Sequence, residues 1–84
     1  MKNKINVDIL VPSISKNYNV FIPINKSVGE VIQLINEAIN NLTDGEFPIL
    51  NNLSLINLDN GTIYNVDMSI KNNKILNGAR LVLM

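Results

Sequence analysis

Hydrophobic and polar residues alternate at the start of the chain. From Lys4 to Val11 the two faces are Ile5, Val7, Ile9 and Val11 on one side and Lys4, Asn6, Asp8 and Leu10 on the other. This period of two predicts a β-strand with one buried face. A second alternating run, Tyr18 to Ile24, follows a short polar connection, so the two runs predict an antiparallel hairpin. Pro23 indicates a sheet edge or a strand end, because proline has no amide hydrogen for a ladder.

From Ser27 to Leu42 the hydrophobic spacing changes to three and four residues, which predicts an amphipathic helix. The apolar stripe consists of Val28, Val31, Ile32, Ile35, Ala38, Ile39 and Leu42. The polar side consists of Gly29, Glu30, Gln33, Asn36, Glu37, Asn40 and Asn41. Ser27 and Glu30 have the spacing of a capping box, in which each side chain satisfies an amide of the first turn. Asp44-Gly45 is expected to end the helix.

The second half of the chain predicts three shorter strands. They are Leu53 to Leu58, Thr62 to Tyr64 after the turn Asp59-Asn60-Gly61, and Ala79 to Leu83 after the turn Asn77-Gly78. The loops between them are expected to be anchored in the core by Phe47, Ile49, Met68, Ile70 and Ile75. The order β-β-α-β-β-β predicts an α+β domain in which one helix packs across a mixed sheet of four to five strands. The face parity of the third strand stays open, because its apolar residues do not alternate.

Composition supports a single small domain, residues 1–84. The chain is 46% hydrophobic, which is enough for a compact core at this length. Its formal net charge is zero and its lysines are scattered, whereas a nucleic-acid site needs clustered cations, so we expect no nucleic-acid partner. The sequence has no membrane-length apolar run and no signal-peptide pattern, so we expect a cytoplasmic protein without direct membrane insertion.

Residues suited to catalysis and metal binding are scarce. The chain has no cysteine and no histidine, which excludes thiolate metal sites and histidine acid–base chemistry. Glu30 and Glu37 are two helical turns apart, too far to act as a close carboxylate pair. We therefore expect no catalytic residues, no metal and no cofactor. A small enzyme or ligand-binding domain remains an alternative, and it would require a deep polar pocket that this composition does not predict.

The predicted order of elements resembles the β-grasp fold of ubiquitin over nearly the whole chain. The most specific segment is Ile70 to Leu83, where an anchored loop is followed by Ile75-Leu76, the Asn77-Gly78 turn and an apolar strand. Within the ubiquitin-like proteins, the ending Asn77-Gly78-Ala79-Arg80-Leu81 is similar to the YukD-like (EsaB-like) family. The opening strand, Lys4 to Asp8, and the helix entry at Ser27-Val28 fit the same family. The loop Asn72-Asn73-Lys74 departs from it, since many members have an aspartate and a glycine there.

This resemblance implies a non-enzymatic accessory or regulatory component of a type VII secretion system in Gram-positive bacteria. Its partner would be a protein, such as a component of the secretion system. The alternative within the same fold is a sulfur carrier or protein modifier. Those proteins act through a C-terminal Gly-Gly, whereas this sequence reads Leu83-Met84 at that place, so we expect neither conjugation nor sulfur transfer.

A partner-binding surface is expected on the sheet face opposite the helix. Leu10, Phe21 and Val82 have the parity of that face, and their strands are neighbours in a β-grasp sheet. Contiguous exposed apolar surface usually marks a partner site, so these three residues are the candidate patch. The alternative is that each is isolated or covered by a loop. A homodimer formed by strand addition at the edge of the second strand is also open.

Overall fold

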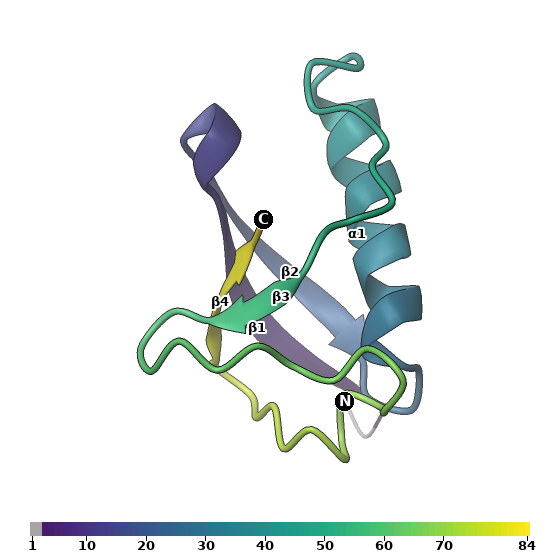
Figure 1. The fold of residues 1–84 in the computed structure, drawn as a ribbon, viewed down its shortest axis with the longest axis vertical. Coiled ribbons are helices and arrows are strands. Elements are labelled where there is room, and N and C mark those ends of the chain that lie inside the picture. The colour runs from purple at the N-terminus through teal and green to yellow at the C-terminus, as the bar shows by residue number, and fades with distance from the viewer. Residues whose placement is uncertain (1–2) are drawn as a thin grey trace.

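The computed structural model describes residues 3–84 as two layers, with a four-stranded sheet packed against one helix (Figure 1). The elements are β1 (Lys4–Val11), the short 3-10 helix η1 (Pro12–Ile14), β2 (Lys16–Pro23), α1 (Val28–Leu42), β3 (Leu55–Asn57) and β4 (Arg80–Leu83). The strand order is β2-β1-β4-β3, and β4 runs parallel to β1 at the centre of the sheet. This is the β-grasp arrangement that the sequence predicts.

The N-terminal hairpin follows the predicted faces. Its register runs from Lys4 opposite Pro23 to Val11 opposite Lys16. Val7, Ile9 and Val11 are buried against the helix, and Asp8 on the other face is exposed. β2 forms one edge of the sheet and Pro23 is its last residue, so both readings of that proline are confirmed.

The helix begins and ends where its signals predict. The Ser27 hydroxyl accepts a hydrogen bond from the Glu30 N–H at 3.1 Å and donates one to Glu30 Oε1 at 3.2 Å. The serine half of the predicted capping box is therefore confirmed, whereas the Glu30 carboxylate bonds to the Ser27 hydroxyl instead of a backbone amide. Asp44 and Gly45 both have positive φ, at 51° and 84°, and the Gly45 N–H donates to the Asn40 carbonyl at 2.8 Å. The chain thus leaves the helix through left-handed backbone, for which glycine is suited.

The core lies between α1 and the inner face of the sheet. Its buried residues include Val7, Ile9, Val31, Ile35, Ile39, Leu55, Leu81 and Leu83. The predicted stripe on α1 is wrong at its far side, because Ala38 is exposed and Leu42 is 70% exposed. Both residues lie at the margin of the apolar stripe, beside the free edge of β2. They are exposed because the sheet no longer covers the helix there.

Asn36 also departs from the expected pattern. The helical spacing places it on the polar side of the helix, yet only 1% of its surface is exposed. Its amide Nδ2 donates to the Pro48 carbonyl at 2.9 Å, and its Oδ1 accepts from the Leu50 N–H at 2.8 Å. The side chain thereby holds the segment after the helix. Phe47 in that segment is buried as predicted, but Ile49 is exposed and is not an anchor.

The third predicted strand is shorter than expected and the fourth is not a strand. β3 covers only Leu55–Asn57, and the run from Thr62 to Tyr64 contributes a single bridge, Ile56 to Ile63. Asn57 accounts for this, because its Oδ1 accepts from the N–H groups of Asp59 and Asn60 and curls the chain into a turn. The pairing of Leu55 with Leu83 settles the open parity of β3, with Leu55 facing the core and Ile56 facing outward.

The long loop before β4 is anchored by two isoleucines and one asparagine. Ile70 and Ile75 are buried as predicted, whereas Met68 is exposed. Asn73 Nδ2 donates to the carbonyls of Asn65, Met68 and Ser69, and its Oδ1 accepts from the Asn65 N–H. Side-chain amides therefore satisfy backbone groups that a regular element would otherwise pair.

Candidate protein-binding surface

The outer face of the sheet, opposite α1, carries a short apolar row. Leu10 on β1 is the parallel partner of Val82 on β4, and Val82 is the antiparallel partner of Ile56 on β3. Leu10 and Ile56 are half-buried, and Val82 between them is 8% exposed. Two of the three predicted patch residues therefore meet, but Val82 forms the floor of this row, and its neighbours provide most of the accessible apolar surface.

Phe21 lies on the same face but apart from this row. It pairs with Asn6, four residues along β1 from Leu10, which corresponds to roughly 13 Å of strand. A polar network fills the interval: Asn6 and Asn19 exchange side-chain hydrogen bonds at 2.9 Å, and Asn19 Nδ2 donates to Asp8 Oδ1 at 2.8 Å. Phe21 is 57% exposed, so it presents its ring at the edge of the sheet rather than in one continuous patch with Leu10.

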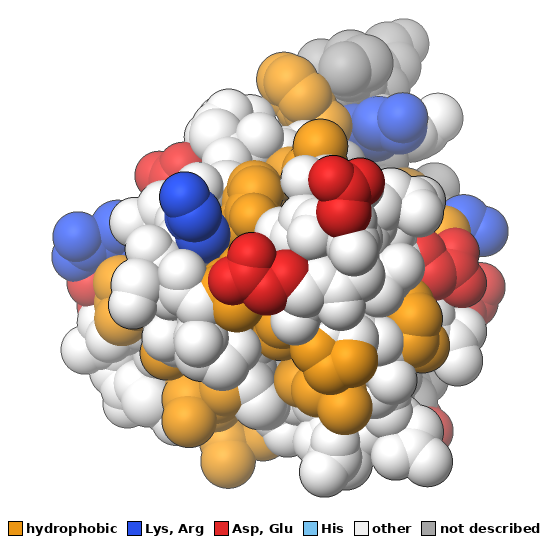
Figure 2. Space-filling view, turned by 90° about the horizontal axis from the view of Figure 1, so that it is seen from above, with side chains coloured by type: hydrophobic (Ala, Val, Ile, Leu, Met, Phe, Trp, Pro, Cys, Tyr) orange, Lys and Arg blue, Asp and Glu red, His pale blue; other side chains and the backbone are white. Residues whose placement is uncertain are grey.

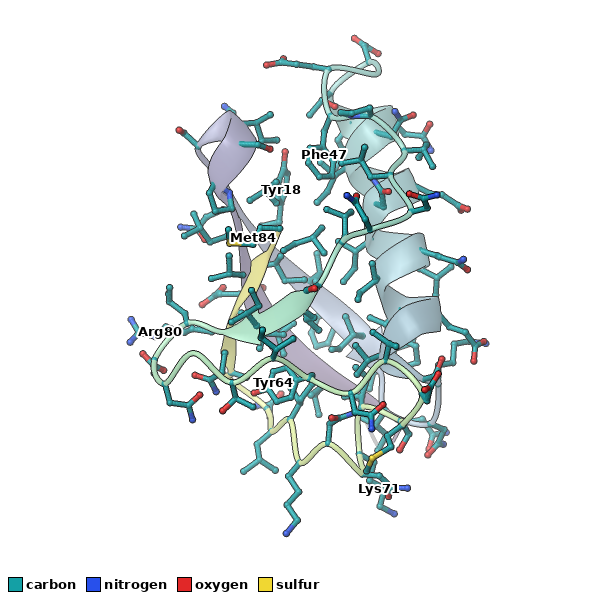
Figure 3. The ribbon with its side chains drawn as sticks, in the orientation of Figure 1. Tyr18, Phe47, Tyr64, Lys71, Arg80 and Met84 are labelled. Carbon is teal, nitrogen blue, oxygen red and sulfur yellow. The ribbon has the colours of Figure 1, made fainter. Side chains whose placement is uncertain are left out.

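An ion pair flanks the polar network. Arg80 is the register partner of Asp8 and its guanidinium binds the carboxylate of Asp59, in the turn after β3. Figure 3 shows the Arg80 side chain extending from β4 toward that turn, away from the helix. Both side chains are more than half exposed, so the pair orients the turn while contributing little stability.

A second apolar surface lies between the free edge of β2 and α1. It is a groove of about 440 Å³. β2 contributes Tyr18, Val20 and Ile22, and the helix contributes Leu34, Ala38 and Leu42. This groove is not among the sequence-based predictions, although the four-residue spacing of Leu34, Ala38 and Leu42 indicates a second apolar line beside the core stripe.

A third hollow of about 900 Å³ lies between the first half of α1 and the segments around residues 49–53 and 66–67. Its lining is mixed and includes the carboxylates of Glu30, Glu37 and Asp67. Glu30 is already engaged by Ser27 and by Lys26, 3.8 Å away. Within residues 3–84, no three His, Cys, Asp or Glu side chains gather to hold a metal ion. Among the described residues, this hollow therefore contains no such cluster of metal ligands.

Charges are distributed without a dominant sign. In the end-on space-filling view, acidic and basic side chains are interspersed with separate groups of hydrophobic side chains (Figure 2). No helix in the described part of the chain is both long and apolar enough to span a bilayer. The outer sheet face and the groove beside β2 both present apolar side chains suited to binding another protein.

Comparison with known proteins identifies the fold. Neither a protein-family model nor a curated protein matches the chain. Among solved structures, the ubiquitin-like domain of EccD5 from Mycobacterium xenopi is similar, with a TM-score of 0.76 and 18% identity over 96% of this chain and 92% of that one. The ubiquitin-like domain of the Mycobacterium tuberculosis type VII secretion protein EccD1 has a TM-score of 0.74 and 12% identity over 96% and 97% of the two chains.

A third similar structure is a chain of the ESX-5 inner membrane complex, with a TM-score of 0.68 and 17% identity. The match covers 98% of this chain but only 21% of that one, so the resemblance is to a part of a larger protein. At these identities the likeness is one of fold. The match nevertheless covers 96% of this chain and more than nine tenths of both ubiquitin-like domains, and the chain has the ubiquitin-like β-grasp fold.

Proposed function

We propose that this chain is a non-enzymatic, ubiquitin-like interaction module that serves a Gram-positive type VII secretion system from the cytoplasm. The observation that carries the proposal is the match, with a TM-score of 0.74 over 96% of the chain, to the ubiquitin-like domain of a type VII secretion system protein. The similarity of the Asn77 to Leu81 segment to the YukD-like family supports an accessory or regulatory role. The absence of histidine and cysteine favours binding over catalysis.

Binding through the outer sheet face would use Leu10 and Phe21 as contact residues. Val82, the neighbour of Leu10 on β4, would lie beside that contact. Leu10 and Phe21 both have apolar surface on this face, at its two ends. The polar network of Asn6, Asp8 and Asn19 lies between them and would contribute hydrogen bonds to a partner. An apolar contact at either end of a polar centre fits a moderate, reversible interface.

The test is affinity capture from the native cell with a tagged form of the full chain. We expect components of the secretion apparatus to be enriched, and the enrichment to fall when Leu10 is replaced by serine. The matched control is Leu76→Ser, because Leu76 is an exposed leucine in the loop before β4. A capture that contains no secretion component would contradict the proposal.

The same preparation tests the alternative of a modifier or sulfur carrier. Met84 exchanges backbone hydrogen bonds with Ser54, at 2.8 and 3.2 Å, so its backbone is held beside β3. Intact-mass measurement of the protein from native cells is expected to show the unmodified chain, and a C-terminal adduct or thiocarboxylate would overturn the binding-module proposal.

A further inference from the structure

We propose that the groove between β2 and α1 binds an extended segment of a partner protein, which adds a fifth strand to the sheet beside β2. The segment would carry alternating apolar residues, with an acidic residue at one end. This inference goes beyond the outer-face contact proposed above by assigning a second binding surface, and it rests on the proposed function only for the identity of the partner. Three features of the groove support it: a free strand edge, an apolar lining and a cationic end.

The free edge follows from the hydrogen-bond register of the hairpin. The Ile24 N–H donates to the Asn3 carbonyl at 2.9 Å, so alternate residues back along β2 direct their backbone groups toward β1. The residues between them, Asn17, Asn19 and Phe21, direct their N–H and C=O groups outward. Within residues 3–84 these outward groups have no backbone partner. From Asn17 to Phe21 they offer a template of roughly 13 Å for an added strand.

The lining matches the side chains of such a strand. Tyr18, Val20 and Ile22 face the helix from β2, while Leu34, Ala38 and Leu42 face the edge from α1. Side chains of an added strand alternate between the two faces of the sheet, so every second one would enter the groove. Figure 3 shows Tyr18 between the hairpin and the helix, at the end of the groove near the tip of the hairpin. Phe21 would contact the side chains on the opposite face of the added strand.

The positive charge at one end of the groove favours a partner segment that carries an acidic residue. The residues that line the groove include two lysines, Lys4 and Lys26, and no acidic residue. Both lysines lie at the end where β2 finishes at Pro23. Lys26 has a weak exposed pairing with Glu30 at 3.8 Å, which a partner carboxylate could displace at little cost. An acidic residue at this end of the bound segment would therefore pair with Lys4 and Lys26.

The same charges disfavour a second copy of this chain as the occupant. β2 reads Lys-Asn-Tyr-Asn-Val-Phe-Ile-Pro and contains no acidic residue. Antiparallel pairing of two β2 edges would place Lys16 of one copy near Lys4 and Lys26 of the other. Like charges opposed across a pair of strands are destabilising. The complementary occupant is thus a segment of a different protein that carries a carboxylate.

The first experiment selects ligands from a phage-displayed library of random short peptides against the full chain. We expect the enriched peptides to alternate apolar residues and to carry an acidic residue at one end. In titrations followed by amide NMR, the selected peptide should shift the signals of Asn17, Asn19 and Phe21 together with those of Leu34 and Ala38. Failure to enrich any such pattern would overturn the proposal, as would shifts confined to the row of Leu10, Val82 and Ile56.

Matched variants then separate the groove from the rest of the surface. Leu34→Gln is expected to weaken the selected peptide about tenfold, because it removes an apolar contact worth about 1.4 kcal/mol. Leu76→Gln, at an exposed leucine of the 64–78 loop, is expected to change affinity less than about twofold. Lys4→Glu should weaken binding severalfold in a salt-dependent way, whereas Lys74→Glu should not. Equal losses in each variant and its control would refute the assignment.

Two further outcomes discriminate between this inference and the proposed function. A dimer in sedimentation experiments that Leu34→Gln dissolves would identify a second copy as the occupant and overturn the inference. Capture of secretion components from the native cell by the Leu34→Gln variant at wild-type yield would also reject the groove while leaving the proposed function intact. Peptide binding that depends on Leu34, combined with capture of no secretion component, would instead retain the groove and reject the function.

Discussion

Asn36 accepts a hydrogen bond from the backbone N–H of Leu50 at 2.8 Å and so ties the segment after the helix to the middle of α1. The same side chain donates to the Pro48 carbonyl. A single asparagine thus satisfies a donor and an acceptor of a segment that has no strand partner there. Its own amide is buried, which makes the arrangement sensitive to substitution at this residue.

Replacement of Asn36 by alanine is expected to lower the free energy of unfolding by about 1–3 kcal/mol, because two hydrogen bonds are lost and polar backbone groups are left beside the helix. Chemical denaturation of the purified domain measures this change. Asn41→Ala is the control, since Asn41 is exposed on the same helix, and it should change stability by no more than about 0.5 kcal/mol. Similar losses in the two variants would mean that the bonds of Asn36 contribute nothing specific.

Removal of the helix cap tests the start of α1. Ser27→Ala deletes the acceptor for the Glu30 N–H, and the expected loss is about 1 kcal/mol of unfolding free energy. Ser27→Asp should retain most of the stability, because its carboxylate can accept the same hydrogen bond and lies at the positive end of the helix dipole. Thermal unfolding followed by circular dichroism would distinguish the two. An equal decrease in both variants would argue against capping as the role of Ser27.

Ile70 tests whether an irregular loop carries part of the core. Its side chain has no exposed surface, although it lies outside the strands and the helix. Ile70→Ala is expected to destabilise the domain by about 2–5 kcal/mol through lost burial and the cavity left behind. Met68→Ala, two residues earlier at an exposed position, should have a much smaller effect. Comparable midpoints of denaturation for the two variants would contradict this assignment.

Phe21→Ser addresses the candidate surface directly. The ring is more than half exposed at the sheet edge, so the variant should remain folded, with a stability change of about 1 kcal/mol or less. Its contact with a partner, or self-association, should weaken. Amide NMR spectra report the fold, and affinity capture reports the contact. Unfolding of the variant would show that Phe21 acts as a core residue and would remove it from the surface.

The parts of the fold that sequence predicts well are those with a simple period. The hairpin faces follow from alternation, and both ends of α1 follow from Ser27 and from Asp44-Gly45. Asn36 and Asn73 could not be assigned in this way, because their roles depend on carbonyls and amides brought near them by tertiary structure. The run from Thr62 to Tyr64 has strand composition, but the Asn57 side chain stabilises a turn that leaves it a single bridge.

For the candidate surface, the sequence predicts which face of the sheet each residue occupies but does not predict the distances between the residues. Leu10, Phe21 and Val82 do point to the outer face, yet their distances depend on register, which alternation alone does not define. The pairing of Phe21 with Asn6 rather than with Leu10 divides the patch. The groove beside β2 needed knowledge of where the helix crosses the sheet, since Leu34 and Leu42 would be equally compatible with a wider core.

The central position of β4 has a consequence for synthesis. In the sheet, β4 (Arg80–Leu83) lies between β1 and β3 and pairs with both, so it joins the N-terminal hairpin to β3. A nascent chain that has emerged only as far as residue 79 contains the hairpin and the helix. It lacks β4, however, so the edge of β1 that pairs with β4 in the folded domain has no partner strand. We therefore expect this domain to complete its folding only after residue 83 has left the ribosome, with a hydrophobic strand edge open to chaperones until then.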